Sequence, residues 1–228
     1  INTWFVSKAA HEAGLKVVLS GVGGDELFAG YPSFRQLPRW RAWLALPSRI
    51  PGLGLASEAV LSGIGSRLEI SPKVAGLLRH GGTWAGVYLL RRGLFLPREL
   101  NTLLDPEILT RGLRRLKEQG AMRSILADAP KKHVARVSLM ESAFYMRNQL
   151  LRDADWASMA HSLELRTPLV DVGLLRTIAP MQHALANKSV LADAMELKSE
   201  VRNRPKTGFT TQIGRASCME RVWVWGGG

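Results

Sequence analysis

The chain has 228 residues, of which 46% are apolar, and a formal net charge of +12. This length suffices for one domain or a large piece of one, with a core that can support folding. The apolar stretches around residues 40–61 are interrupted by Arg, Pro, Gly and Glu, so none reaches the roughly 20 unbroken residues of a membrane span. The residues near Ile1 show no signal-peptide pattern. We therefore expect a soluble, cytoplasmic protein with no membrane among its partners.

The cysteine, histidine and charge patterns exclude several kinds of site. Cys218 is the single cysteine, which excludes an internal disulfide framework and a multi-cysteine zinc site. The five histidines are scattered without metal-ligand spacing, and we expect none to bind a metal. The basic residues fall in small groups such as Arg91-Arg92, with no basic stripe interleaved with aromatic residues. Solvated faces explain most of them, so we predict no nucleic-acid partner.

The first 25 residues predict a helix, a strand and a second helix. Asn2 and Thr3 are typical cap residues for a helix over residues 4–13, which Gly14 would end. Val17-Val18-Leu19 is a short apolar run between glycines, as expected of a buried parallel strand. We predict a strand at about residues 16–20 and a helix that starts near Asp25.

Helical segments broken by Pro and Gly follow. The predicted helices lie near residues 34–46, 55–64, 84–92, 106–118, 133–151 and 155–163. The most regular segment carries Val137, Met140 and Phe144 on an apolar stripe, which indicates core packing, with Glu141 elsewhere around the wheel. The sequence thus predicts a mostly α-helical chain with one or two short parallel strands near the N-terminus.

The segment 212–228 differs from the rest of the chain. Its run from Ile213 to Cys218, followed by alternating Val and Trp and three glycines, resembles the translation of a sequencing-adapter read-through. We expect this segment to be a non-native tail, and Cys218 belongs to it.

The sharpest motif runs from Ser20 to Tyr31, with the sequence SGVGGDELFAGY. Glycines at the end of a strand let backbone N–H groups approach an anion, and the following helix N-terminus adds a partial positive charge. The pattern favours a phosphate or pyrophosphate ligand. Asp25 has two interpretations, a helix cap or a ligand of Mg²⁺ whose other ligands are phosphate oxygens and water.

The whole string resembles the asparagine synthetase family, whose synthetase domain carries SGxGxDExFxGY after a core strand. Every fixed position of that pattern is present. A second family block matches residues 152–160 and the positions from Ser162 to Asp171 that follow, and a third matches residues 204–209. The three blocks appear in the family's order and span most of the chain.

The resemblance implies an α/β fold, that of the adenine-nucleotide α-hydrolase-like synthetase domain, and an ATP-dependent ligase. In the family, ATP adenylates the carboxylate of aspartate, and ammonia, released from glutamine by a separate N-terminal glutaminase domain, then forms the amide. By resemblance, Asp25 would bind the Mg²⁺–pyrophosphate and Lys206 would neutralise phosphate charge. The nucleotide would be lined by Ser20, Gly21, Gly23 and Gly24. Tyr31 would lie near the acyl adenylate, or its ring would anchor the helix.

Four charged residues of the second block have a structural interpretation. Arg152, Asp155, Glu164 and Arg166 alternate in charge through adjoining turns. Such spacing is typical of a buried ionic scaffold, which we favour over a catalytic role.

Two departures from the family limit the inference. Some members have a glutamate at the position of Val22, and valine cannot transfer protons, which leaves the acceptor carboxylate and the amine donor open. The upstream SGGxDS pyrophosphate loop does not occur in the chain. Residues 1–211 are therefore interpreted as the C-terminal portion of a synthetase domain, and we expect this piece to be inactive by itself.

Two alternatives and the oligomeric state stay open. One alternative is a related ligase, such as a β-lactam-forming or biosynthetic-cluster amide synthetase. The other, from a different class, is a non-catalytic remnant or basic binding module. A homodimer is neither indicated nor excluded.

Overall fold

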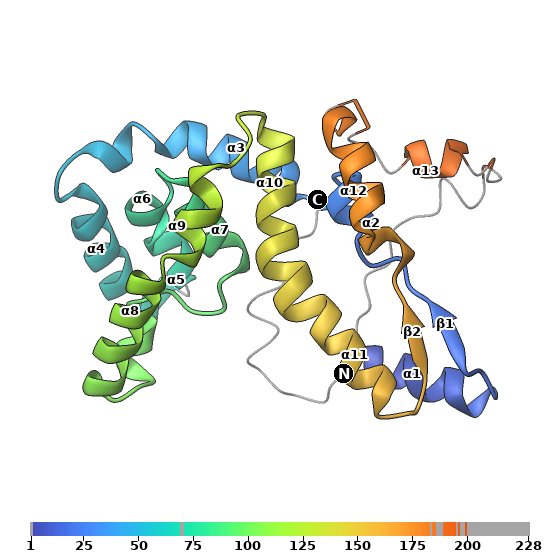
Figure 1. Ribbon diagram of the computed structural model, residues 1–228. Coiled ribbons are helices and arrows are strands. Elements are labelled where there is room, and N and C mark those ends of the chain that lie inside the picture. Colours follow the sequence, from blue (N-terminus) through green and yellow to red (C-terminus); the bar gives the residue numbers. More distant parts are fainter. Residues whose placement is uncertain are drawn as a thin grey trace.

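The computed structural model describes residues 2–68, 71–182, 184–185, 189–194, 196 and 199. Figure 1 shows three regions: a lobe of helices on one side, a two-stranded sheet with the N-terminal helix at the opposite side, and a long helix between them. The predicted fold class, mostly helical with a short parallel sheet, is confirmed.

The secondary structure of the N-terminal region forms as predicted, but the strand expected to be buried has Val17 and Leu19 exposed. Helix α1 (Asn2–Glu12) is followed by strand β1 (Val17–Leu19) and the short helix α2 (Gly24–Leu27). The helix α1 starts two residues earlier than expected, so the predicted cap residues lie in its first turn. Gly14 ends the helix with a positive φ of 80°, which glycine adopts without steric cost.

The second strand begins directly after a segment that was predicted to be helical. Strand β2 (Glu164–Arg166) pairs with β1 in parallel, with Val17 opposite Glu164 and Leu19 opposite Arg166. The predicted helix over residues 155–163 is wrong at its end, because α11 stops at Met159. The second strand also lies far from the N-terminus in the sequence, whereas the prediction placed both strands near it. The helix stops at Met159 because the chain turns at Ser162, whose φ is +50°, and buries Leu163.

The helical lobe confirms four predicted helices. They are α3 (Ser33–Leu44), α4 (Leu53–Leu68), α7 (Trp84–Arg92) and α8 (Pro106–Gln119). Shorter elements complete the lobe: η1 (Pro47–Arg49), α5 (Pro72–Ala75), α6 (Leu77–His80), η2 (Glu99–Thr102) and α9 (Ala121–Ala127). Side-chain caps fix two starts, since Thr83 accepts from the Gly86 N–H and Asp105 accepts from the N–H groups of Glu107 and Ile108.

The long helix is continuous where two helices were predicted. It comprises α10 (His133–Met140), the π-helical segment η3 (Glu141–Leu150) and α11 (Leu151–Met159). A π segment inside an α-helix is uncommon and is frequently found at functional sites. The last described elements are η4 (Pro168–Val170), α12 (Val172–Ile178), η5 (Ala179–Met181) and α13 (Ser189–Ala194).

The main apolar core joins the lobe to the long helix. Its buried members come from α3, α7 and α10: Phe34, Leu37, Trp84, Val87, Tyr88, Val137 and Met140. A smaller cluster of Leu27, Phe28 and Ile178 holds α2 against α12. Within the described residues, no helix is both long and apolar enough to cross a bilayer.

Candidate functional site

The glycine-rich loop leaves the carboxyl end of β1 and enters α2, as the sequence predicts. The Ser20 N–H donates to the Arg166 carbonyl at 2.8 Å, which extends the strand pairing by one residue. The Ser20 hydroxyl then accepts a bond from the Val22 N–H at 3.3 Å. These two bonds place Ser20, Gly21, Gly23, Gly24 and Asp25 together at one edge of the sheet.

Gly23 is the position in this loop where a side chain would not fit without strain. Its φ is +95°, and a Cβ at this position would lie 2.7 Å from the Leu169 carbonyl oxygen. Leu169 belongs to η4, which lies near the end of the second family block. The absence of a side chain at Gly23 therefore allows the first and second blocks to touch, although they are far apart in the sequence.

A small cavity lies where these segments meet. Its volume is about 70 Å³. The residues that line it come from α2, η3, η4 and α12 and the turns beside them: Gly23, Glu26, Leu27, Ser142, Met146, Leu169, Val170, Asp171, Val172 and Leu175. The glycine-rich loop and the second family block therefore both line this cavity.

The carbonyl end of α2 is fixed by two side chains from distant elements. The Ser138 hydroxyl donates to the Glu26 carbonyl at 2.8 Å. The Gln182 amide donates to the carbonyls of Glu26 and Leu27 at 3.0 and 3.2 Å and to the Ser138 hydroxyl at 2.7 Å. Because the last carbonyls of a helix have no partner within it, these bonds hold a four-residue helix that would be unstable alone.

Glu26, next to the predicted metal ligand Asp25, is 1% exposed. The Tyr31 hydroxyl donates to its Oε1 at 3.1 Å, whereas its Oε2 has no hydrogen-bond partner among the described residues. Burial raises the pKa of the Glu26 carboxyl above its usual value, and the nearby carboxylates of Asp25 and Glu141 add to this, against the Tyr31 hydrogen bond.

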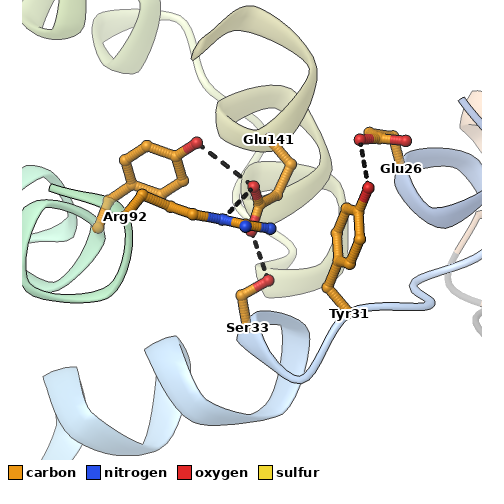
Figure 2. A network of polar contacts seen from close by, with 6 residues as sticks. Glu26, Tyr31, Ser33, Arg92 and Glu141 are labelled. Atoms are coloured by element: carbon orange, nitrogen blue, oxygen red, sulfur yellow. Dashed lines mark hydrogen bonds and ion pairs between the residues drawn. The ribbon is translucent and has the colours of Figure 1, made fainter. Parts of the chain in front are cut away.

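Tyr31 is held on both its hydroxyl and its ring (Figure 2). The Arg92 guanidinium lies 4.9 Å from the Tyr31 ring centroid and 3.6 Å from that of Tyr145. Burial, together with the charge of Glu26, raises the pKa of the Tyr31 hydroxyl, which keeps it protonated as a donor to Glu26. The geometry matches the interpretation of Tyr31 as an anchor of the motif helix, and its predicted place beside an acyl adenylate stays a prediction.

Glu141 was expected away from the apolar stripe, but its side chain is fully buried. It accepts hydrogen bonds from the hydroxyls of Ser33 and Tyr88 and pairs with the Arg92 guanidinium at 3.1 Å (Figure 2). The partners come from α3 and α7, so Glu141 ties both helices to η3. Sequence reasoning missed this role and that of Glu26, although Glu141 lies four residues after buried Val137 and therefore on the same helix face.

The structure describes the predicted nucleotide and metal residues of the loop but not Lys206. Ser20 and Asp25 are half-buried at the loop edge. No group of three or more acidic, histidine or cysteine side chains that could hold a metal occurs in the described part of the chain. A single carboxylate still fits Mg²⁺, because this ion usually keeps several waters and takes substrate phosphates as ligands. Lys206, with the third block and the tail, lies outside the described residues.

The buried ionic scaffold predicted for the second block is wrong. Arg152, Asp155, Glu164 and Arg166 are all exposed, and Arg166 pairs with its neighbour Glu164 at 2.7 Å in the open. β2 pairs with β1 and packs against α11, and the side chains that these two elements, β2 and α11, turn outward lie in solvent. Asp155 and Glu164 instead line a concave region of about 340 Å³ between α11 and β2.

Comparison with known proteins agrees with the motif assignment. The family model of asparagine synthase matches residues 1–224. A protein of Mycobacterium tuberculosis named as a glutamine-hydrolyzing asparagine synthetase is 28% identical over 224 residues, covering 93% of this chain and 32% of the relative. Asparagine synthetase (glutamine-hydrolyzing) 1 of Bacillus subtilis is 26% identical over 221 residues, with 93% and 33% covered. The chain thus spans about a third of the length of these relatives, and no solved structure matches it.

Proposed function

Because this chain belongs to the asparagine synthase family, we propose that it forms the C-terminal part of the synthetase domain of an ATP-dependent, amide-forming ligase. The observation that carries the proposal is the contact between Gly23 and Leu169. It joins the glycine-rich loop to the second block and leaves the loop amides at the sheet edge, where parallel α/β folds bind their ligands.

The proposed reaction has two steps. An oxygen of the substrate carboxylate attacks the α-phosphorus of ATP and pyrophosphate leaves. An amine nitrogen then attacks the carbonyl carbon of the acyl adenylate, AMP leaves with the bonding electron pair, and the nitrogen loses a proton. Aspartate is the proposed carboxylate, and ammonia derived from glutamine is the proposed amine.

The loop residues have electrostatic roles in the first step. The backbone N–H groups of Gly21 and Gly23 and the first turn of α2 would face the phosphates, while Asp25 would hold Mg²⁺, which neutralises phosphate charge when bound. Lys206 is the proposed second cation for the leaving pyrophosphate. A lysine suits this role because its ammonium is a mobile point charge.

Glu26 and Tyr31 are proposed to position the loop. The Tyr31–Glu26 hydrogen bond fixes the side chain next to Asp25. The bonds from Ser138 and Gln182 fix the backbone of the same residue. Any rotation of α2 would break several of these bonds together, so Asp25 would be presented in one orientation, as precise positioning of reacting groups requires.

The carboxylate acceptor is the least determined part of the proposal. Val22 occupies the position where some family members carry a glutamate. A valine side chain cannot act as an acid or base there. A ligase of the same superfamily with another carboxylate is therefore the second candidate. A panel of carboxylates, starting with aspartate, distinguishes the two by which one supports exchange of pyrophosphate into ATP.

The decisive experiment measures carboxylate-dependent ATP–pyrophosphate exchange by the full-length protein with Mg²⁺. Asp25→Asn and Lys206→Ala should each slow exchange by about 10²- to 10³-fold, the loss typical of one strong charge-stabilising group. Asp128→Asn is the matched control, since Asp128 is an exposed acid in the helical lobe, and it should leave exchange unchanged. Exchange that survives both active-site changes would contradict the roles assigned to them.

A second measurement addresses the boundary of the active unit. Residues 1–211 are expected to show no exchange by themselves, because positioning of the reacting groups is worth about 7–11 kcal/mol of the barrier and requires a complete site. Comparable exchange by residues 1–211 and the full-length protein would show that the nucleotide site is complete within this stretch.

A further inference from the structure

The solvent face of α4 is apolar along its described length. Its exposed residues are Leu55, Ala56, Ala59, Val60, Gly63 and Ile64, which recur at the spacing of one helix face. Leu55 and Val60 are 59% and 58% exposed. Among the side chains described in α4, those of residues 53–64, none on this face is charged, whereas a helix on the surface of a soluble protein normally presents polar side chains to water.

The inner face of α4 is mixed, with polar side chains beside half-buried Leu53 and Leu61. Glu58 is buried there and forms an ion pair with Arg79 of α6, and Ser57 and Ser62 lie on the same half-buried side. Gly54 permits the close approach, because a Cβ there would lie 2.9 Å from the Arg79 Cα. The described exposed side chains of α4 are therefore all apolar although a charged residue of the same helix is buried, which indicates that the outer face contacts something less polar than water.

The apolar surface extends onto the preceding segment. Trp43, Leu46 and Ile50, at the end of α3 and around η1, are exposed, and Trp43 is 71% exposed. The segment η1 contacts both α3 and α4, so this group lies near α4. Figure 1 places α4 at the outer edge of the lobe, at the opposite end of the molecule from β1 and β2.

Exposed arginines flank the apolar surface. Arg35 and Arg39 precede Trp43 at intervals of four residues on α3, and Arg49 follows in η1. The Arg39 guanidinium lies 5.6 Å from the Trp43 ring centroid. The segment 35–132 holds 17 of the 31 Lys and Arg but 7 of the 19 Asp and Glu, so it carries +10 of the formal net charge of +12.

We propose that α4 and the end of α3 form a docking surface for an anionic membrane, with α4 lying in the plane of the interface. An uncharged apolar face suits the acyl boundary, an exposed Trp suits the headgroup level, and flanking arginines suit anionic lipids. This revises the expectation that no membrane is among the partners. It concerns peripheral binding and does not depend on the proposed ligase activity.

Charge and side-chain chemistry favour an anionic membrane over two other partners, a second copy of the chain and a nucleic acid. A second copy of the chain would bring together two lobes that each carry +10, which opposes close contact between them. A nucleic acid would find phosphate contacts at the flanking arginines, but the described part of α4 has no basic or stacking aromatic side chain, so its apolar face would gain no contact. An anionic bilayer satisfies both the charge and the apolar face.

The test is sedimentation of the full-length protein with vesicles of phosphatidylcholine containing about 30 mol% phosphatidylglycerol, compared with pure phosphatidylcholine. Binding is expected to the anionic vesicles and to weaken as salt is added. Val60→Glu with Ile64→Glu should reduce the partition coefficient about ten-fold or more, because two carboxylates would enter the apolar boundary. Replacing Arg35, Arg39 and Arg49 by Gln should reduce it by about five-fold for each charge.

The matched control is Met159→Glu, which places a carboxylate on an equally exposed apolar position of α11, outside the lobe. It should leave vesicle binding unchanged. Circular dichroism of each variant confirms that the helices persist. A lipid-induced blue shift of tryptophan fluorescence that is lost in Trp43→Phe would support insertion at this surface.

Three outcomes would overturn the proposal. They are no binding to anionic vesicles at low salt, equal binding by the double glutamate variant, and a homodimer that this variant dissociates without any vesicle binding.

Discussion

The junction around Glu141 and the sheet of β1 and β2 differ in which kind of side chain they bury. At the junction, a fully buried carboxylate is surrounded by an arginine and two hydroxyls from α3 and α7. In the sheet, apolar Leu19 is 75% exposed, although a parallel strand is normally covered on both faces. The polar group is enclosed and the apolar group is open.

This difference shows where the described chain is tightly packed. The junction combines residues from three helices with the main apolar core, so a change there affects many contacts. The sheet edge carries the glycine-rich loop but gains little from burial of its own side chains. We therefore expect stability to depend on the junction and the loop geometry to depend on a few specific contacts.

The largest expected effect is at Glu141. Glu141→Ala should lower the free energy of unfolding by about 3–5 kcal/mol, because Arg92 would stay half-enclosed without its counter-charge. Urea denaturation of the chain measures this. Arg166→Ala, which removes the exposed pair with Glu164, is the control and should cause no measurable change. Equal effects of the two substitutions would show that the Glu141 cluster contributes no more than a surface pair.

A similar contrast is expected for apolar side chains. Met140→Ala should lower the free energy of unfolding by about 2–5 kcal/mol, since it leaves a cavity in the core. Leu19→Ala removes a side chain that is mostly in water and should change it by less than about 0.5 kcal/mol. The same urea titration compares them. A large loss from Leu19→Ala would mean that the strand is covered in solution.

A smaller effect is expected in the loop. Gly23→Ala should cost about 1–3 kcal/mol, because alanine is strained at a φ of +95° and its Cβ meets the Leu169 carbonyl. Gly21→Ala is matched to it, since a Cβ at Gly21 meets nothing within 4 Å. Thermal denaturation should separate the two variants. If both melt together, the contact between the two motif blocks is not needed for folding.

The smallest effect is a pH dependence from Glu26. Burial raises its pKa in the folded state, so the folded chain binds a proton more tightly than the unfolded chain. Stability should therefore fall as the pH rises from the unfolded value near 4.5 through the raised folded value, by at most about 1.4 kcal/mol per pH unit.

Glu26→Gln removes this titration and keeps an oxygen that can accept from Tyr31. The free energy of unfolding of this variant, measured between pH 5 and 8, should depend less on pH than that of the parent chain. An unchanged pH slope would show that Glu26 does not titrate in this window.

Local sequence signals predicted much of the fold. Thr83 and Asp105 cap helices that begin within one residue of the predicted positions, because a cap satisfies N–H groups only two or three residues away. The order of strand, glycine loop and helix over residues 17–27 also formed as predicted, although the strand is not buried. In each case, the energetics are decided by residues close together in the sequence.

The failures involve partners that are distant in sequence. Strand β2 forms because β1 lies beside it, and a three-residue segment carries too little pattern to reveal its neighbour. The charged residues of the second block were assigned to the interior because their spacing resembles an ion-pair network. Spacing along a helix does not state which face is covered.

What the sequence by itself determined is the family motif, the order of the helices and the glycine loop, since each depends on local backbone preferences. Only the tertiary structure decided that Glu26 and Glu141 are buried and that the apolar face of α4 points to solvent. The physical reason is that burial is a property of the neighbours. A carboxylate enters the interior when an arginine, hydroxyl or amide from another element can compensate its desolvation, and an apolar face stays exposed when no described element covers it.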